Sequence, residues 1–472
     1  MDANVRLVSS EHNEKQWVKR WHTVIAVTLF AATAAIGGGV GAFFAGSSSG
    51  DDRASGDESK APRTEPADKC NFSNVSFPSP LLQCSCLSKI NMTSPTTTSL
   101  YGELKSQLLS DYVGPDDDCH PENIALWWAA TERANSHADN VFDATSAEAE
   151  FSAQRYALAL LHLSVNDWQS EDSSGWLGAG SECDWRGISC NSLLRVSGID
   201  MSNLGLEGEL PPTAFALLPF LNSIVMSGNK LYQRIPSEVW TLMDLQVLDL
   251  SYNSLSGSIP DDIVSLTELT SLKLNNNRFT GRIPPGLYTS LGDLSELDFS
   301  SASMTGTISD DIGFLTNLEA VAFANNEFKG SLPTTLGFLT SITSLIVAGN
   351  YFTGTLPTEL ALLSNLETMD ASLNVFTGPL PTELGSLTEL MFLRLSTNKL
   401  TGTIPESLGK LSKLETLMLS ASHLTSAIPT FEQDLNAFTG SVPNGLCAVE
   451  QLSVPCSVKC DCCTWSGRTK CS

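Results

Sequence analysis

Apolar residues return at a constant interval along residues 196–440. In LQVLDLSYNSLSGSIP, residues 245–260, leucines alternate with polar positions before an Asn and a Gly. The same frame recurs at LTSLKLNNNRFTGRIP, ITSLIVAGNYFTGTLP, LETMDASLNVFTGPLP and LMFLRLSTNKLTGTIP. A fixed period of about 24 residues predicts a repeat architecture. One unit cannot bury its own leucines, so successive units must stack into a solenoid with a shared core.

Each position of the repeated phrase has a physical role. The leucines point inward from a short strand, and Asp249 alternates to the opposite face. Asn253 ends the strand, and stacked copies predict a ladder of Asn amides that bond backbone groups of the turns. Gly257 permits a positive φ, Ile259 returns to the core, and Pro260 fixes the next turn.

The phrase resembles the plant-type leucine-rich repeat, whose hallmark is the GxIP segment. This resemblance implies an α/β solenoid that is curved, with a parallel β-sheet on its concave face and a second short strand after the ladder. The column equivalent to Asn253 advances by 24 or 25 residues and runs Leu204, Asn229, Asn253, Asn277, Ala302, Asn326, Asn350, Asn374, Asn398 and Ser422.

The period breaks near its end, because Asn436 follows Ser422 after only 14 residues. The intervening IPTFEQDLNAFTG lacks about ten residues of a normal unit and places Gln433 where the core requires Leu. We therefore expect a repeat domain over 192–446 with ten repeats in phase and one truncated coil. That coil is either malformed or has lost a segment.

An uncharged apolar segment runs from Thr23 to Ala45 near the N-terminus. As a helix it would span about 34 Å, enough to cross a bilayer core of about 30 Å. Basic residues precede it and acidic residues follow, so the positive-inside rule predicts a single-pass type II anchor over 23–46. Residues 1–22 would then be cytosolic, and the C-terminal domain extracellular or lumenal. A cleaved signal peptide, whose small-x-small site Phe43 spoils, and a buried soluble helix are the alternatives.

The anchor and the next segment contain three further signals. Gly37 and Gly41 have the GxxxG spacing that can pair membrane helices into a homodimer, although helix composition alone can produce it. Ser, Gly, Asp and Pro dominate the start of residues 47–98, which predicts a disordered stalk. The stalk contains clustered N-glycosylation sequons at Asn71, Asn74 and Asn91.

Residues 99–191 are expected to form a helical neck that ends in a cap. Within AEAEFSAQRYALALLHLSV, apolar residues fall at helical spacing on one face. QRYALALLHLSVNDW and GWLGAGSECDWRGISC resemble the N-terminal cap of plant-type repeat proteins. The resemblance implies a Cys183–Cys190 disulfide with Trp185 packed over the first coil. An open solenoid end exposes its core, so a stapled aromatic residue would cover it.

The strand positions between the leucines form the predicted binding surface, because solenoids bind through that face. Asp249, Lys273 and Asp298 give an alternating charged patch, whereas Phe392 and Arg394 belong to a more apolar patch that suits a protein contact. The alternative is that these are ordinary solvated strand residues. The candidate ligand-binding residues are Asp249, Tyr252, Lys273, Asn276, Asp298, Ile346, Asp370, Phe392, Arg394 and Met418.

All twelve cysteines lie after residue 69, on one side of the apolar segment, which indicates disulfides in an oxidising compartment. Six of them lie in residues 447–472, which we expect to form a disulfide-stapled C-terminal cap. Zinc is the alternative, since CxCC brings thiolates together, although spaced CxxC pairs with His are more typical of zinc sites. We expect no metal and no other cofactor.

The net charge of −25 argues against nucleic acid as a partner, because phosphate binding requires basic patches. No nucleophile elbow, Walker loop or kinase motif set is present in the sequence, so we expect no enzyme. The chain resembles receptor-like proteins and polygalacturonase inhibitors without a kinase domain. That resemblance implies extracellular recognition of a protein, peptide or glycan ligand through the concave face, with any signal passing through a partner. The alternative is a structural or adhesive cell-surface protein without a diffusible ligand.

Overall fold

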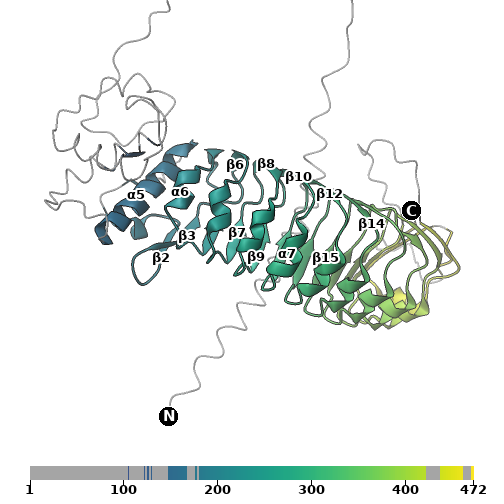
Figure 1. Cartoon of the computed structure of the whole chain (residues 1–472). Coiled ribbons are helices and arrows are strands. Elements are labelled where there is room, and N and C mark those ends of the chain that lie inside the picture. Colours follow the sequence, from purple (N-terminus) through teal and green to yellow (C-terminus); the bar gives the residue numbers. More distant parts are fainter. Residues whose placement is uncertain are drawn as a thin grey trace, which may run out of the picture. The chain divides into compact units, whose positions relative to one another are not determined.

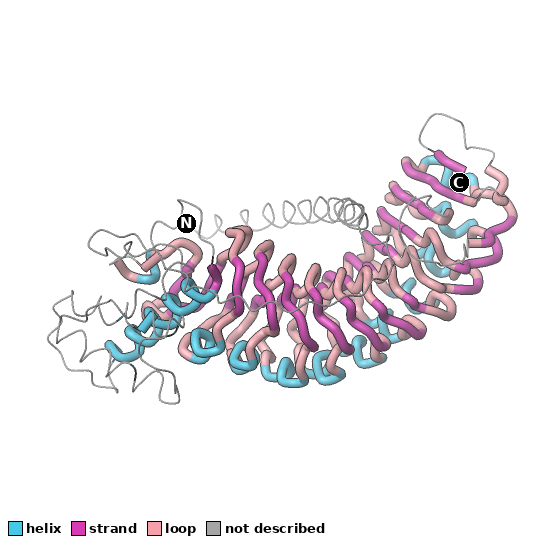
Figure 2. Tube along the Cα trace, turned by 90° about the horizontal axis from the view of Figure 1, so that it is seen from above, coloured by secondary structure: helices cyan, strands magenta, loops and turns pink. Residues whose placement is uncertain are grey.

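A computed structural model describes residues 147–166, 176–177, 180–420, 436–455, 457–460 and 469–471, with isolated positions at 105, 122, 125, 126 and 129. The repeats form one curved solenoid in which strands run side by side and short helices line the outer edge (Figures 1 and 2). The predicted anchor at 23–46, the GxxxG pair, the stalk and the three sequons lie outside the described residues. Within the described residues, no helix is both long and apolar enough to cross a membrane.

One sheet contains one strand from each repeat and faces the concave side. Its neighbours pair in parallel register, except for the antiparallel pair at the N-terminal end. The order is β2 (Ile188–Cys190), β3 (Val196–Asp200), β5 (Ser223–Val225), β7 (Val247–Asp249), β9 (Ser271–Lys273), β11 (Glu296–Asp298), β13 (Ala320–Ala322), β15 (Ser344–Ile346), β17 (Thr368–Asp370), β19 (Phe392–Arg394), β21 (Thr416–Met418), β23 (Gln451–Val454) and β24 (Thr469–Cys471). The predicted concave parallel sheet is confirmed.

A second set of strands follows the Asn position of the repeats, as the family resemblance implied, and β1 of the N-terminal cap pairs antiparallel with the first of them. One sheet contains β1 (Val165–Asn166), β4 (Glu207–Glu209), β6 (Lys230–Gln233), β8 (Ser254–Ser258), β10 (Arg278–Gly281), β12 (Ser303–Gly306), β14 (Glu327–Gly330) and β16 (Tyr351–Phe352). Another contains β18 (Thr377–Gly378), β20 (Lys399–Thr403) and β22 (Ala437–Thr439). Gly257 in β8 has φ +93°, so the predicted positive φ is confirmed there.

Short helices form the convex side, where the sequence predicted only a covering leucine. After each GxIP segment the chain makes about one tight turn, because Pro fixes φ at the turn and a buried residue follows two or three positions later. These helices are α6 (Pro212–Ala216), η3 (Ser237–Thr241), η4 (Asp261–Ser265), α7 (Pro285–Ser290), η5 (Asp310–Phe314), η6 (Thr334–Phe338), η7 (Thr358–Leu362), η8 (Thr382–Ser386), η9 (Glu406–Lys410) and η10 (Asn444–Ala448).

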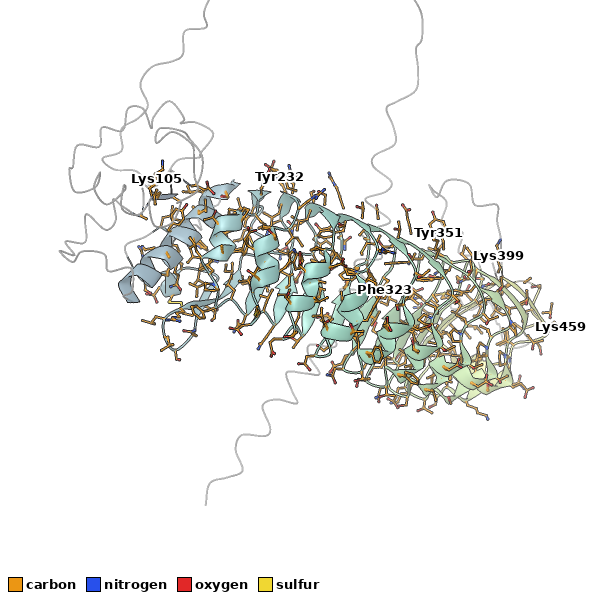
Figure 3. The ribbon with its side chains drawn as sticks, viewed as in Figure 1. Lys105, Tyr232, Phe323, Tyr351, Lys399 and Lys459 are labelled. Atoms are coloured by element: carbon orange, nitrogen blue, oxygen red, sulfur yellow. A yellow bond between two sulfur atoms is a disulfide. The ribbon has the colours of Figure 1, made fainter. Side chains whose placement is uncertain are left out.

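The core runs continuously between the strands and the convex helices. Leucines of successive repeats are fully buried, and phenylalanines stack at ring-centroid distances of 6.3 Å for Phe328–Phe352 and 6.2 Å for Phe352–Phe376. Figure 3 shows Phe323 in the interior, whereas Tyr232 and Tyr351 lie along the outer edge of the second sheet and are 41% and 42% exposed. Stacking therefore supplies the burial that one repeat lacks.

The predicted Asn ladder is confirmed in atomic detail. Asn350 Oδ1 accepts a hydrogen bond from Phe328 N at 3.1 Å, and its Nδ2 donates to Phe323 O at 2.8 Å. The same amide also donates to Val347 O and Ala348 O within its own repeat. Each Asn thus satisfies backbone groups of two neighbouring coils, and these groups are buried away from water.

The hydrogen bonds of Asn436 correct the prediction of a truncated coil after Ser422. Asn436 Oδ1 accepts from Leu400 N at 3.0 Å, and its Nδ2 donates to Leu395 O at 2.9 Å, so it follows Asn398 directly in the ladder. The same Nδ2 donates to Leu419 O of β21 at 2.8 Å. The step from Asn398 to Asn436 is therefore 14 residues longer than one repeat, and residues 421–435, which include Gln433, lie outside the described residues.

The N-terminal cap closes the first coil as predicted. Helix α5 (Ala147–Ser164) is rich in Ala and Leu, which favour helices, and its residues 156–161 are fully buried. The disulfide joins Cys183 in η2 (Glu182–Asp184) to Cys190 in β2. Trp185 is 3% exposed, with its ring centroid 5.2 Å from that of Trp176. The disulfide and the packed tryptophan that the family resemblance implied are both confirmed.

Gln154 of α5 joins the helix to the first repeat, a role that the sequence did not indicate. Its Oε1 accepts from Val196 N at 2.6 Å, and its Nε2 donates to Glu182 Oε1 at 2.9 Å. At the other end of the solenoid, Cys447 and Cys460 are both disulfide-bonded, in agreement with a disulfide-stapled C-terminal cap.

Candidate functional site

The central outward positions of the concave strands form one continuous row. Strand pairing places Asp249 beside Lys273 and Lys273 beside Asp298. Farther along, Ile346 pairs with Asp370 and, one strand later, Asp370 with Arg394. The complete central row reads Asp200, Val225, Asp249, Lys273, Asp298, Ala322, Ile346, Asp370, Arg394, Met418 and Ser453. The structure thus brings together seven of the ten candidate residues.

The other three candidates border the central row. Tyr252 and Asn276 follow their strands with φ +54°, and Tyr252 is 39% exposed. Phe392 lies two residues before Arg394 in β19, and the Arg394 guanidinium carbon is 5.9 Å from the centroid of its ring. Phe392 and Arg394 therefore do form one local patch, in which the cation contacts an aromatic face.

Glu296 is a member of the charged patch that sequence reasoning missed. Its carboxylate oxygen lies 2.8 Å from Lys273 Nζ and accepts a hydrogen bond from Ser271 Oγ at 3.0 Å. The residue is buried, at 7% exposure. The available signal was its position two residues before Asp298 on the same strand, which places both carboxylates on one face. Lys273 thus has three acidic neighbours, Asp249, Asp298 and Glu296.

Four aspartates of the central row, Asp200 among them, are anchored by serines two residues later. Asp370 Oδ1 accepts from Ser372 N at 3.0 Å and from Ser372 Oγ at 2.6 Å, while its Oδ2 lies 3.7 Å from Arg394 Nη1. Asp249 accepts the same two bonds from its serine, and Asp298 accepts the backbone bond at 2.8 Å. The repeated Asp-x-Ser in LDLS, LDFS and MDAS was the sequence signal. These carboxylates therefore have fixed orientations.

Burial disfavours the ionised form of two of these carboxylates. It raises the pKa of Asp298 to about 6, with hydrogen bonds from Ser300 opposing the shift and the nearby charge of Glu296 adding to it. Burial also raises the pKa of Asp370, against the effects of its Ser372 hydrogen bonds and of the Arg394 charge. Asp298 therefore changes charge near pH 6.

The middle of the concave face is apolar and built from small side chains. Ala322, Ala324, Ile346 and Ala348 are apolar residues whose strand positions alternate with the core positions. The four lie outside the core cluster that contains their neighbours, such as Val321, but they are themselves only 5–8% exposed. The central row therefore presents a charged segment, an apolar segment and a second charged segment across successive repeats.

We expect Asp298→Asn to remove a pH-dependent loss of stability. The folded-state pKa of about 6 exceeds the value of about 3.9 for an unfolded Asp. The stability contribution of Asp298 is therefore fully present below about pH 4 and is lost as the pH rises through 6. The difference in unfolding free energy between the variant and the wild type should increase by about 1–2 kcal/mol, in favour of the variant, as the pH rises from 4 to 7.5. Urea unfolding at each pH measures this difference.

Asp200→Asn is the matched control for that experiment. Asp200 accepts the same hydrogen bonds from Ser202 but is exposed. An equal pH-dependent gain in both variants would contradict burial as the cause of the Asp298 shift.

Comparisons with known proteins agree with the repeat architecture. The Leucine Rich Repeat family model matches residues 244–266, 268–289 and 389–411. Among curated Arabidopsis thaliana proteins, the receptor-like serine/threonine-protein kinase SKM1 is 37% identical over 59 residues, which cover 12% of this chain and 6% of SKM1. The receptor-like kinase RGI4 is 36% identical over 103 residues, covering 21% of this chain and 9% of RGI4. The chain thus spans less than a tenth of the length of these relatives.

Solved structures of plant receptor ectodomains share the fold. The leucine-rich repeat ectodomain of Arabidopsis thaliana GASSHO1/SCHENGEN3, in complex with CASPARIAN STRIP INTEGRITY FACTOR 2, is 32% identical, with a TM-score of 0.57 over 64% of this chain and 35% of that one. The Arabidopsis receptor kinase HAESA, in complex with the peptide hormone IDA and the co-receptor SERK1, is 28% identical. Its TM-score is 0.55 over 64% of this chain and 49% of the HAESA chain.

Proposed function

The chain is a leucine-rich repeat protein whose repeats are of the plant type, and we propose that it recognises a peptide or an extended protein segment on its concave face. The central row carries this proposal. Its apolar segment at Ala322 and Ile346, which are 6% and 8% exposed, offers a shallow apolar floor, and the flanking carboxylates of Asp298 and Asp370 offer orientation. Binding sites combine apolar contact with a few fixed polar groups in this manner.

The charge of the concave face favours a ligand with basic groups. Positive charge on and beside the described strands from β3 to β21 comes from Arg195, Lys273 and Arg394. The acidic residues of the same region are Asp200, Asp249, Glu296, Asp298, Glu319, Glu367, Asp370 and Glu415. Electrostatic complementarity increases association rates and selects partners. We therefore infer a ligand whose apolar centre is flanked by Lys or Arg.

The structural neighbours support a peptide over a glycan. The GASSHO1/SCHENGEN3 and HAESA ectodomains are both described in complex with a peptide or protein factor, and the HAESA complex also includes a co-receptor. By analogy, a signal from this chain would pass through a partner protein. Binding, rather than catalysis, is the activity that we propose for the whole chain.

We also propose that residues 23–46 anchor the chain and that the repeats lie on the extracellular side. The Cys183–Cys190 disulfide supports this placement, because such bonds persist in oxidising compartments. Protease added to intact cells that express a chain tagged at both ends should remove the C-terminal tag and spare the N-terminal tag. Protection of the C-terminal tag in intact cells would contradict the proposed topology.

Panning a random twelve-residue peptide library on the full chain in lipid nanodiscs tests the recognition function. We expect enriched peptides to contain apolar residues between basic ones. Ile346→Lys should weaken their binding at least about tenfold, because it removes apolar contact and repels the flanking charges. Met243→Lys adds the same charge at a convex residue that is 67% exposed and should leave binding unchanged. Equal binding to both variants would overturn the assignment to the concave face.

A further inference from the structure

Three successive repeats expose a large apolar side chain at the same convex position. Phe314, Phe338 and Leu362 are the last residues of η5, η6 and η7 and are 64%, 59% and 55% exposed. We call these three residues the convex ridge. The short helices that contain them line the outer edge of the solenoid (Figure 2). They face away from the concave row to which the recognition function is assigned.

Folding does not require apolar residues at this position. The last residues of the corresponding helices are polar in five other repeats, namely Thr241, Ser265, Ser290, Ser386 and Lys410, and are alanines, Ala216 and Ala448, in the two end repeats. The residue that follows each member of the ridge is a buried leucine, so burial at the next position already completes the helix. Single exposed apolar residues are ordinary, but adjacent ones mark interaction sites.

The helices that carry the ridge pack closely across repeats. A Cβ placed on Gly313 would lie 3.1 Å from Phe338 Cδ2, so the Phe338 ring lies against the residue before Phe314. Gly337 is similarly close to Glu359 of the next repeat. The absence of a side chain at both glycines lets consecutive helices approach closely. The three residues therefore follow one another as a strip along consecutive, closely packed helices.

Acidic side chains border this strip. Asp310 and Asp311 begin η5, Glu359 lies in η7, and Glu383 lies in η8. The helix segments 309–318, 333–342 and 357–366 contain neither Lys nor Arg. Among the ion pairs within the described part of the chain, none includes these four acids. We call these four acids the acidic rim, and the charge beside the ridge is thus negative.

The spacing of the ridge suits a helix. Adjacent strands are about 4.8 Å apart, and the outer edge of a curved solenoid is wider, so Phe314 and Leu362 are separated by at least about 10 Å. Residues i and i+7 of an α-helix lie about 10 Å apart along its axis, with i+3 or i+4 between them. A second copy of this chain is disfavoured, because its ridge has the same negative rim and its net charge is −25.

We propose that the convex ridge is a docking site for a basic amphipathic helix of a partner protein. The partner places an apolar stripe on Phe314, Phe338 and Leu362, and its flanking Lys or Arg residues lie near the acidic rim. This site is separate from the concave row, so the protein holds a ligand on one face and a protein partner on the other.

The probe for this site is a fluorescent eighteen-residue peptide with Leu at helical i, i+3, i+7 spacing and Lys at the flanking positions. Fluorescence anisotropy with the full chain in nanodiscs should show saturable binding. The triple variant Phe314→Ser, Phe338→Ser, Leu362→Ser should weaken it at least about tenfold, because it replaces the ridge with the serine found in neighbouring repeats. Met243→Ser removes an isolated exposed apolar residue and should change nothing.

Further variants separate the ridge from general charge attraction. If the triple variant does not fold, Phe338→Thr alone should still weaken binding, and Asp310→Asn with Glu359→Gln should reduce the salt dependence. A peptide with the same composition but no apolar stripe should bind weakly to every variant. Equal binding of the striped peptide to the wild type and the triple variant would overturn the proposal. Self-association of the wild type in sedimentation velocity, lost in the triple variant, would also overturn it in favour of a second copy.

Discussion

Trp185→Ala is expected to lower the free energy of unfolding by about 3–5 kcal/mol, the largest loss for any substitution considered. The ring is buried and contacts Trp176, and the Arg155 guanidinium carbon lies 5.3 Å from its centroid. Its removal leaves a cavity at the end of the solenoid, where no further repeat can close it. Limited trypsin digestion should then cleave rapidly in the cap, where Arg186 and Arg195 lie.

Two further variants show whether the effect of Trp185→Ala comes from loss of the cap or from general destabilisation. Cys190→Ser should expose the same region with a smaller loss of about 2–3 kcal/mol, because it opens only a short loop. Leu193→Ala changes a cap residue that is 64% exposed and should leave the digestion pattern unaltered. Unchanged protease resistance in both Trp185→Ala and Cys190→Ser would show that the first coil needs no cap.

Asn350→Ala should cost about 3 kcal/mol of unfolding free energy, the second largest effect. The substitution leaves Phe328 N without its acceptor, and Phe323 O keeps only the longer bond from Asn326 Nδ2 at 3.2 Å; both groups are buried between coils. Each unsatisfied buried group costs about 1–3 kcal/mol. Chemical denaturation monitored by circular dichroism measures the loss.

A surface Asn and a missing ladder position provide the controls. Asn365→Ala removes a single hydrogen bond to Thr340 O at an exposed convex site and should cost less than about 1 kcal/mol. Ala302→Asn restores the ladder at one of its gaps and should stabilise the protein by about 1 kcal/mol. Equal costs for Asn350→Ala and Asn365→Ala would contradict the conclusion that the Asn350 amide stabilises two neighbouring coils.

Much of the fold could be predicted from the sequence because the positions that determine the structure of a repeat all lie within that repeat. The leucines, the Asn and the GxIP turn recur within one unit, so the strands, the ladder and the cap disulfide were predicted correctly. The central row was also predictable, because every strand contributes the same position to it. Asn436 was misinterpreted because a constant period cannot show where an insertion enters. Only its hydrogen bonds to Leu400 and Leu395 place it in the ladder.

The remaining features depend on neighbours that are distant in the chain. Glu296 meets Lys273 across two adjacent strands, and Gln154 meets Val196 across 42 residues. The convex ridge appears only when residues 24 positions apart are compared at a helix end that the sequence did not predict. The Asp-x-Ser pairs, by contrast, were visible in the sequence and show that part of the polarity of the concave face stabilises strand ends.

Photo-crosslinking tests the binding role of the central row most directly. A peptide enriched by panning receives a benzophenone at its apolar centre and is irradiated on the full chain, and mass spectrometry locates the linked residue. We predict cross-links to strands β13, β15 and β17, around Ala322, Ile346 and Asp370, that disappear in Ile346→Lys. Cross-links confined to the convex helices or to the second sheet would contradict the account.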